Sequence, residues 1–254
     1  MHLQYVQKNK KDHELLQNYT VPPPLPNDVD FQSLIVNKPW GYEYLMYKNE
    51  KVEVWSLFIR SGASTSTHCH PNKKTGLIAV EGVAEFSTLG ETLTLQKFDA
   101  VMIDQGVFHA TRALSPQGVH VIEVETPPAK HDLLRVHDQY GRAGTHYEGL
   151  EQMSPQEGEA VRLTQPPHKQ AISRVYINCI VGVHHIGDAW EAHEHPQGSV
   201  PHITVILNGT IDFESREKIF QPGDIIPHEL VHDIAVHAKL LDVTIMTLQQ
   251  RSED

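Results

Sequence analysis

Residues 62–82 read GASTSTHCHPNKKTGLIAVEG and carry the clearest pattern in the chain. His68 and His70 are two positions apart, so both imidazoles point to the same face of an extended strand. Neutral imidazole is the commonest metal ligand in proteins, and two on one face provide half of a typical site. A third histidine, His109, follows a glycine-containing segment at residues 104–108. The pattern predicts a metal site built on strands.

The second half of the chain repeats this spacing. His193 and His195 are again two positions apart, His202 follows them, and His232 closes a later segment. The first histidines of the two halves are 125 residues apart, and the last histidines are 123 residues apart. Landmarks that recur in the same order at a nearly constant distance indicate an internal repeat.

Both halves resemble the signature motifs of the cupin superfamily, which place two histidines, a glutamate and a later histidine inside a small antiparallel β-barrel. The resemblance implies an all-β chain with two tandem cupin barrels of the double-stranded β-helix, or jelly-roll, type. Strand patterns and turn residues divide the chain accordingly. We expect an N-terminal arm at residues 1–30, a first barrel at 31–142, a linker at 143–170 and a second barrel at 171–250.

This resemblance implies two metal centres. The first would use His68, His70 and His109, with Thr75 at the position of the family's glutamate. Imidazole suits zinc, iron, manganese and nickel, so the ligands predict a divalent metal ion without selecting one. The alternative for both barrels is a site that no longer binds an ion and in which the histidines remain as polar residues of the barrel core. The second centre would use four imidazoles, those of His193, His195, His202 and His232.

The first barrel also resembles the cupin domain of type II mannose-6-phosphate isomerases. A Lys-Pro-Trp-Gly block begins at Lys38, an Asp-Leu-Leu-Arg segment ends at Arg135, and Tyr-Gly-Arg ends at Arg142, in the order of that family. The match with that family's closing arginine implies a catalytic role for Arg135. A surface arginine that follows an aspartate is the alternative.

The centre of the barrel departs from the isomerase pattern, because His68 replaces a glutamine and Thr75 replaces the glutamate. Lys73, on the turn beside the expected metal, is a candidate to hold a phosphate or carboxylate group. An ordinary solvated lysine is the alternative. Glu123, in a strand-like apolar run, is a candidate general base.

Two reactions and one binding role remain open. The isomerase resemblance favours a metal-dependent sugar-phosphate or nucleotide-sugar isomerase or epimerase of surface-carbohydrate metabolism. Three-histidine sites without a carboxylate are also typical of cupin dioxygenases that use non-haem Fe(II). A bicupin that binds a sugar or another small molecule without turnover is the third possibility, since a fold does not imply an activity.

Composition limits the partners. The net charge of −11 argues against nucleic acid or an anionic membrane surface, so a small-molecule substrate is expected. No apolar run approaches the roughly 20 residues of a membrane span, and the polar start does not resemble a signal peptide. The two cysteines form no metal or redox pattern, which fits a reducing cytoplasm. A homodimer is expected, because exposed sheet edges need covering.

Overall fold

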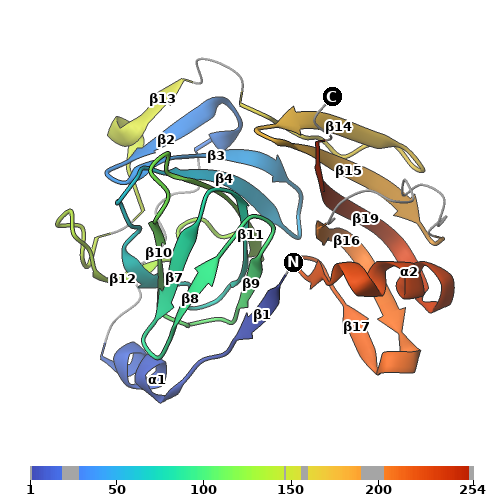
Figure 1. The fold of residues 1–254 in the computed structure, drawn as a ribbon, viewed down its shortest axis with the longest axis horizontal. Helices are drawn as coiled ribbons and strands as arrows, with labels where there is room; N and C mark the ends of the chain where they lie inside the picture. The colour runs from blue at the N-terminus through green and yellow to red at the C-terminus, as the bar shows by residue number, and fades with distance from the viewer. Residues whose placement is uncertain (1, 19–28, 146, 156–159, 190–202, 252–254) are drawn as a thin grey trace.

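The chain is predominantly β-structure. The computed structural model describes residues 2–18, 29–145, 147–155, 160–189 and 203–251. Within these ranges the α-helices are α1 (Lys10–Gln17) and α2 (His228–His237), and strands form most of the rest. No helix in the described part is long and apolar enough to cross a membrane. The prediction of an all-β chain is confirmed, and the strands form two units in tandem (Figure 1).

Two sheets build the first unit. The larger has eight strands in the order β1-β9-β6-β11-β4-β3-β2-β13, and the smaller has five in the order β12-β5-β10-β7-β8. The larger sheet consists of β1 (Leu3–Val6), β9 (Ala100–Ile103), β6 (Lys74–Glu81), β11 (Val119–Thr126), β4 (Glu53–Ile59), β3 (Gly41–Lys48), β2 (Leu34–Lys38) and β13 (Met153–Pro155). The smaller consists of β12 (Leu134–His137), β5 (Thr67–Cys69), β10 (His109–Ala113), β7 (Ala84–Thr88) and β8 (Thr92–Leu95).

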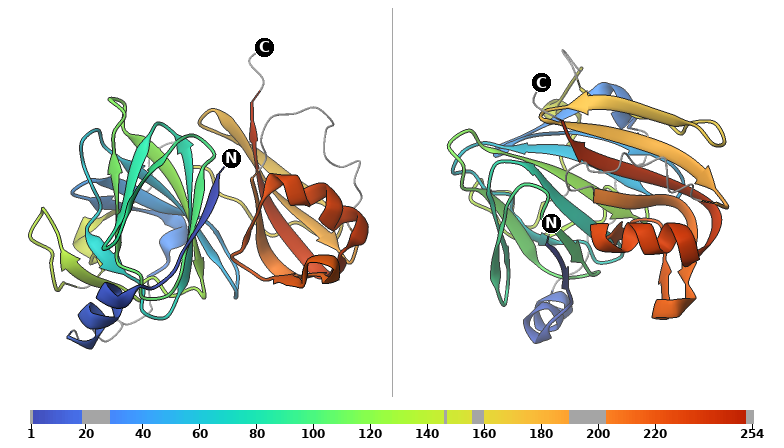
Figure 2. Two further views of the ribbon diagram at one scale, coloured as in Figure 1. Left: turned by 60° about the horizontal axis from the view of Figure 1, so that its bottom comes forward. Right: turned by 45° about the vertical axis from the view of Figure 1, so that its right-hand side comes forward.

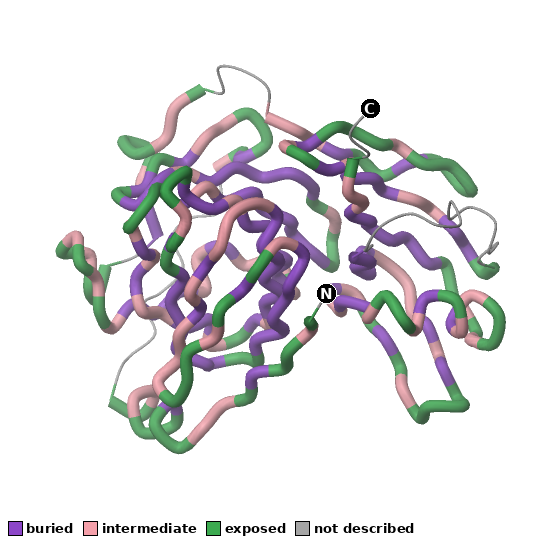
Figure 3. Tube along the Cα trace, in the orientation of Figure 1, coloured by how far each residue is buried: buried purple, intermediate pink, exposed green. Residues whose placement is uncertain are grey.

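Along each strand of the first unit, successive side chains point alternately to the inside and to the outside of the barrel. On β11, Val119 and Val121 belong to the apolar cluster inside the barrel, and Glu123 follows on the same face. Ile122 and Val124 point to the opposite face and join a second apolar cluster. Because β11 is buried on both faces, nearly all its residues are buried (Figure 3).

The second unit is one six-stranded sheet in the described part of the chain. It consists of β14 (Ala171–Tyr176), β15 (Cys179–Gly187), β19 (Lys239–Gln250), β16 (Ile203–Phe213), β17 (Lys218–Phe220) and β18 (Ile225–Ile226), the last paired with β16. One face packs on the outside of the larger sheet of the first unit, where Val205 and Met246 share an apolar cluster with Tyr44 and Ile78. Helix α2 covers the other face (Figure 2).

Helix α2 replaces the repeat expected around His232. In the first half His109 opens strand β10, whereas residues 228–237 of the second half are helical. Leu230, Val231 and Ile234 lie on one side of this helix and pack on the apolar face of the sheet. Apolar residues that recur every three or four positions favour a helix here, although the repeat predicts a strand.

The expected arm and linker both contact the first unit. Strand β1 pairs in parallel with β9, and α1 packs Leu15 and Leu16 against the smaller sheet. Asn9 caps α1 through a capping box with Asp12. In the expected linker, β13 pairs with β2 and the Leu163 N–H donates to the Met46 carbonyl at 2.8 Å. Both segments thus help to enclose the first barrel.

Candidate metal centre

Three histidines converge inside the first barrel. His68 lies on β5, His70 directly follows that strand, and His109 begins β10, where it pairs with His68. One candidate ligand atom from each imidazole lies within 4.8 Å of those from the other two. Two short strands therefore bring together residues 39 to 41 positions apart in the sequence, as the spacing predicts.

Each imidazole is oriented by a backbone carbonyl. A carbonyl oxygen only accepts, so the Nδ1 atom it contacts carries the hydrogen and the Nε2 lone pair is left for a ligand. Nε2 of His70 is buried and makes no hydrogen bond within the described residues. This donor set fits a divalent metal ion. The Nδ1 contacts are 2.8 Å from His68 to Ser66 O, 2.7 Å from His70 to Asp132 O and 2.9 Å from His109 to Val107 O.

Burial keeps the three imidazoles neutral. Desolvation lowers the pKa of His109 to about 4 and that of His68 and His70 well below the usual value. A second cause for His68 is the charge of His109, and for His70 it is the charge of Lys73. Metal ligation requires the neutral form of imidazole, so the site is prepared for an ion at neutral pH.

The carboxylate beside the histidines comes from β11. Thr75, at the glutamate position of the family, is buried, and its hydroxyl makes no hydrogen bond within the described residues. Glu123 extends from the neighbouring strand, with Oε1 3.9 Å from Nε2 of His70. Burial and then the charge of Glu125 raise the pKa of Glu123 to about 7. The structure therefore brings the expected general base to the histidines.

Lys73 is a buried residue, contrary to the solvated-loop alternative. Its Nζ lies 2.7 Å from Oε2 of Glu125, and both side chains are at most 1% exposed. Lys130 lies 3.1 Å from Glu125 and 3.2 Å from Glu43. Its ammonium also lies 3.8 Å from the centre of the Trp55 ring, a favourable cation–π distance. Lys73 thus faces the cavity as part of a chain of alternating charges.

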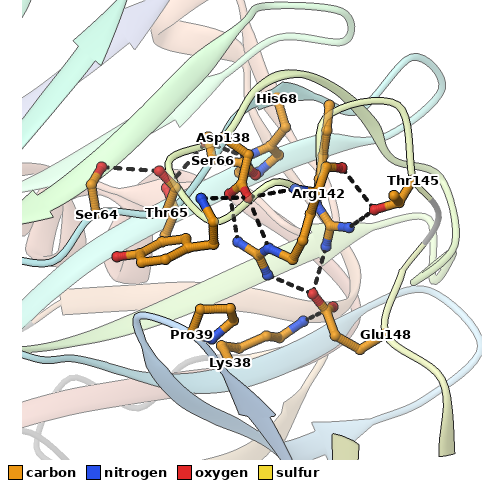
Figure 4. Close-up of polar contacts among 12 residues, drawn as sticks. Lys38, Pro39, Ser64, Thr65, Ser66, His68, Asp138, Arg142, Thr145 and Glu148 are labelled. Carbon is orange, nitrogen blue, oxygen red and sulfur yellow. Dashed lines mark hydrogen bonds and ion pairs between the residues drawn. The ribbon is translucent and has the colours of Figure 1, made fainter.

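Arg135 is buried as well. It lies on β12 as the register partner of His68, so both side chains point to the same side of the sheet. Its Nη2 donates to Oε1 of Glu148 at 2.8 Å, and Nη1 of Arg142 donates to the same oxygen at 2.6 Å. Lys38 pairs with the other oxygen of Glu148 (Figure 4). The surface-arginine alternative is therefore wrong for Arg135.

A cavity of about 50 Å³ lies between these groups. A buried water needs roughly 10–15 Å³ by this measure, so the space suits an ion and a few waters. Three kinds of side chain meet there: imidazoles at metal-ligand spacing, carboxylates and buried cations. The lining includes His68, His70, His109, Glu123, Lys73 and Arg135.

The histidines of the expected second centre do not form a comparable cluster in the described part of the chain. His232 is exposed on α2. The sheet face beneath α2 is apolar, with Ile206, Phe213 and Phe220 buried there. The second metal centre therefore stays a prediction. The other three expected ligands, His193, His195 and His202, lie outside the described residues.

Sequence reasoning missed several charged residues of the cavity. Glu125 follows Glu123 two positions later, with a valine between them. This spacing indicates that both carboxylates point to the same, inward face of one strand. Lys130 and Glu148 have no such signal, because they lie on connections after strands. Tyr147 and Glu148 come from the expected linker, and their positions depend on how that segment folds back.

Known proteins resemble the first unit. A family model described as a cupin domain matches residues 57–125. The Xanthan biosynthesis protein XanB of Xanthomonas campestris pv. campestris (strain B100) is 28% identical over 109 residues, which cover 42% of this chain and 23% of that protein. A mannose-1-phosphate guanylyltransferase of Sinorhizobium fredii is 26% identical over 104 residues, covering 40% and 20%. The chain thus matches less than a quarter of the length of either relative.

Solved structures also align with part of the chain. KdgF from Halomonas sp. has a TM-score of 0.34 and 23% identity, and the alignment covers 41% of this chain and 94% of that one. An RmlC-like cupin from Shewanella frigidimarina has a TM-score of 0.34 and 20% identity, with coverage of 40% and 92%.

Proposed function

Because residues 57–125 form a cupin domain, we propose that the chain is a metal-dependent enzyme that isomerises or epimerises a sugar phosphate or nucleotide sugar. The observation that carries this proposal is the convergence of three oriented imidazoles, the carboxylate of Glu123 beside them and buried cations on a single cavity. The relatives named for xanthan biosynthesis and for mannose-1-phosphate support a carbohydrate substrate.

His68, His70 and His109 would hold the divalent ion. When bound, such an ion polarises a carbonyl or enediolate oxygen as a Lewis acid. The three Nδ1 hydrogen bonds fix the imidazole rings, so the ligands need little rearrangement when the ion binds.

Glu123 would move the proton in this reaction. Its carboxylate lies beside His70 inside the barrel, where it can accept a proton from the carbon next to the substrate carbonyl. Returning that proton to the neighbouring carbon, while the hydroxyl proton moves to the former carbonyl oxygen, completes an isomerisation. In an epimerisation an acid on the other face, for which Lys73 and Lys130 of the cavity are candidates, would protonate the same carbon while Glu123 keeps the proton it took. Lys73 and Arg135 would bind the anionic group and hold the substrate against this base.

Metal content tests the first step. Tag-free wild type should contain a stoichiometric divalent metal by elemental mass spectrometry, and His70→Ala should lose it. The exposed His137 on β12 provides a control, and His137→Ala should keep the metal.

The metal-loaded protein should then interconvert aldose and ketose phosphates or nucleotide sugars. Glu123→Gln should keep the metal and lose turnover, and inactivity of wild type across a broad panel would contradict the proposal.

One observation favours a second candidate function. Within the described residues the cluster with ligand spacing contains three imidazoles and no carboxylate, which suits a non-haem Fe(II) dioxygenase. Oxygen uptake by the Fe(II)-loaded protein with thiol, diketone or aromatic substrates would support it. A protein that purifies with zinc and consumes no oxygen after iron loading would rule it out.

A further inference from the structure

We propose that Lys38, Arg135 and Arg142 form an anion-binding subsite, and that the Glu148 carboxylate holds the place taken by the phosphate group of a substrate. The choice of a sugar phosphate as the complete ligand rests on the proposed function. The subsite itself rests on the geometry of these four side chains.

Three cations converge on one carboxylate. Arg135 and Arg142 donate to Oε1 of Glu148 at 2.8 Å and 2.6 Å, and Lys38 pairs with Oε2. The side chains of Lys38, Arg135 and Glu148 are 3–4% exposed and that of Arg142 is 15% exposed. A carboxylate has two oxygens to share among these donors, whereas a phosphate group offers three. Guanidinium groups match phosphate geometry particularly well.

Glu148 occupies the subsite as an ionised carboxylate, which an incoming anion would replace. Burial would raise the pKa of Glu148, but the charges of Lys38 and Arg135 outweigh it and lower the pKa, so Glu148 carries one negative charge. A phosphate monoester carries about −1.5 to −2 at neutral pH. Exchange of Glu148 for phosphate therefore keeps every donor occupied, while Lys38 keeps its ion pair with Glu43 at 3.3 Å and Arg142 keeps its ion pair with Asp138 at 2.8 Å.

The location connects this subsite to the metal centre. Arg135 and His68 are directly opposite on β12 and β5, and cross-strand neighbours have Cβ atoms about 4.5–5.5 Å apart. Lys38, Arg135 and His68 all line the same cavity. A small substrate with its phosphate at Arg135 thus reaches the three imidazoles with its other end.

The cavity is too small for the substrate unless Glu148 moves out of the subsite. A volume of about 50 Å³ suits an ion and waters and is too small for a sugar phosphate. Tyr147, the neighbour of Glu148, lines the same cavity, and its hydroxyl donates to Glu43. Withdrawal of Tyr147 removes part of the cavity wall, and withdrawal of the adjacent Glu148 uncovers the donors of Lys38, Arg135 and Arg142. The cavity then enlarges as the anion enters.

Titration of inorganic phosphate into the chelator-treated 254-residue chain tests the subsite. Calorimetry should show weak phosphate binding to wild type and binding about tenfold tighter, or more, to Glu148→Gln, because the competing carboxylate is gone. Glu125→Gln is the matched control. It removes a buried carboxylate whose ion pairs are with Lys73 and Lys130, so it should show no such gain. Arg142→Met in the Glu148→Gln background should abolish the gain.

Equal phosphate affinity of wild type and Glu148→Gln would overturn the proposal, and so would an equal gain in Glu125→Gln. Glu148→Asp, which keeps the charge but shortens the side chain, should give an intermediate gain and serves if Glu148→Gln does not fold. Because metal-free protein is used, failure here leaves the metal-dependent reaction standing. Conversely, absence of turnover does not affect the phosphate titration.

Discussion

Asp12 and Phe108 are joined by a hydrogen bond across 96 residues of sequence. The Phe108 N–H donates to Oδ1 of Asp12 at 3.0 Å, and the Asn9 N–H donates to Oδ2 at 2.8 Å. Asp12 lies on α1 and is completely buried. Since Phe108 directly precedes His109, the N-terminal helix anchors the turn that presents the third imidazole.

Asp12→Ala should therefore reduce both stability and metal affinity. It leaves two backbone donors without their acceptor, which costs about 1–3 kcal/mol of unfolding free energy when the groups are buried. Loss of a group that positions a ligand typically weakens metal binding by roughly 10–100-fold. Urea unfolding and competition with a chromogenic chelator measure the two effects. Lys10→Ala, at a 91% exposed side chain on the same helix, should change neither.

Glu43 should give the protein a distinct sensitivity to acid. Burial would raise its pKa, but Lys130 and Lys38 outweigh burial and lower the pKa to about 2 from a usual value of 4.5. The ionised group thus contributes about 3 kcal/mol of stability above pH 4.5, and this contribution is lost as the pH falls from 4.5 towards 2. Urea unfolding at several pH values should show the stability gap between wild type and Glu43→Gln shrinking over this range.

The exposed Glu50 provides the comparison for Glu43. Glu50→Gln should lie close to wild type at every pH, because an exposed carboxylate near no buried cation contributes little to stability. A gap between wild type and Glu43→Gln that is constant from neutral pH to pH 2 would contradict the depressed pKa.

A divalent metal ion should stabilise the native chain through the three histidines. An ion present at 100 times its dissociation constant adds about 2.7 kcal/mol when it binds only the native state. Thermal unfolding with and without a chelator should show this difference in wild type and should show none in His109→Ala. If the chelator shifts His109→Ala as much as wild type, the stabilising ion binds elsewhere.

Gly41 of the Lys-Pro-Trp-Gly block should not tolerate a side chain. A Cβ at this position would lie 1.8 Å from the carbonyl oxygen of Phe58, a backbone atom of the neighbouring strand. Gly41→Ala should thus separate β3 from β4 and destabilise the protein by more than about 4 kcal/mol, a loss found only for specific structural causes. Gly62→Ala is the control: its Cβ would have nothing within 4 Å, so only the cost of its positive φ remains, about 1–2 kcal/mol.

The histidine cluster of the first barrel was predictable, because the spacing of its residues marks them in the sequence. His68 lies on β5 and His70 directly follows that strand, and the pairing of β10 with β5 brings His109 to them. Glu123 was predictable in the same way, because its side chain points to the face opposite Ile122 and Val124, which is the inside of the barrel.

The remaining features depend on long-range packing, which the sequence pattern does not encode. Lys38 and Glu148 pair across 110 residues, and Glu148 belongs to a segment expected to be a linker. Helix α2 was also missed. A segment in which histidine and acidic residues interrupt aliphatic ones is compatible with a strand and with a helix, and the apolar sheet beneath it selects the helix.

The apolar layer shared by the two units determines how the protein loses its structure. Tyr44, Ile78 and Ile122 of the first unit and Val205 and Met246 of the second are all almost completely buried in that one layer. Neither unit can melt without exposing the apolar side chains of the other to water. Heat should accordingly produce a single calorimetric transition with equal van't Hoff and calorimetric enthalpies. The two units, although separate along the sequence, should therefore unfold together.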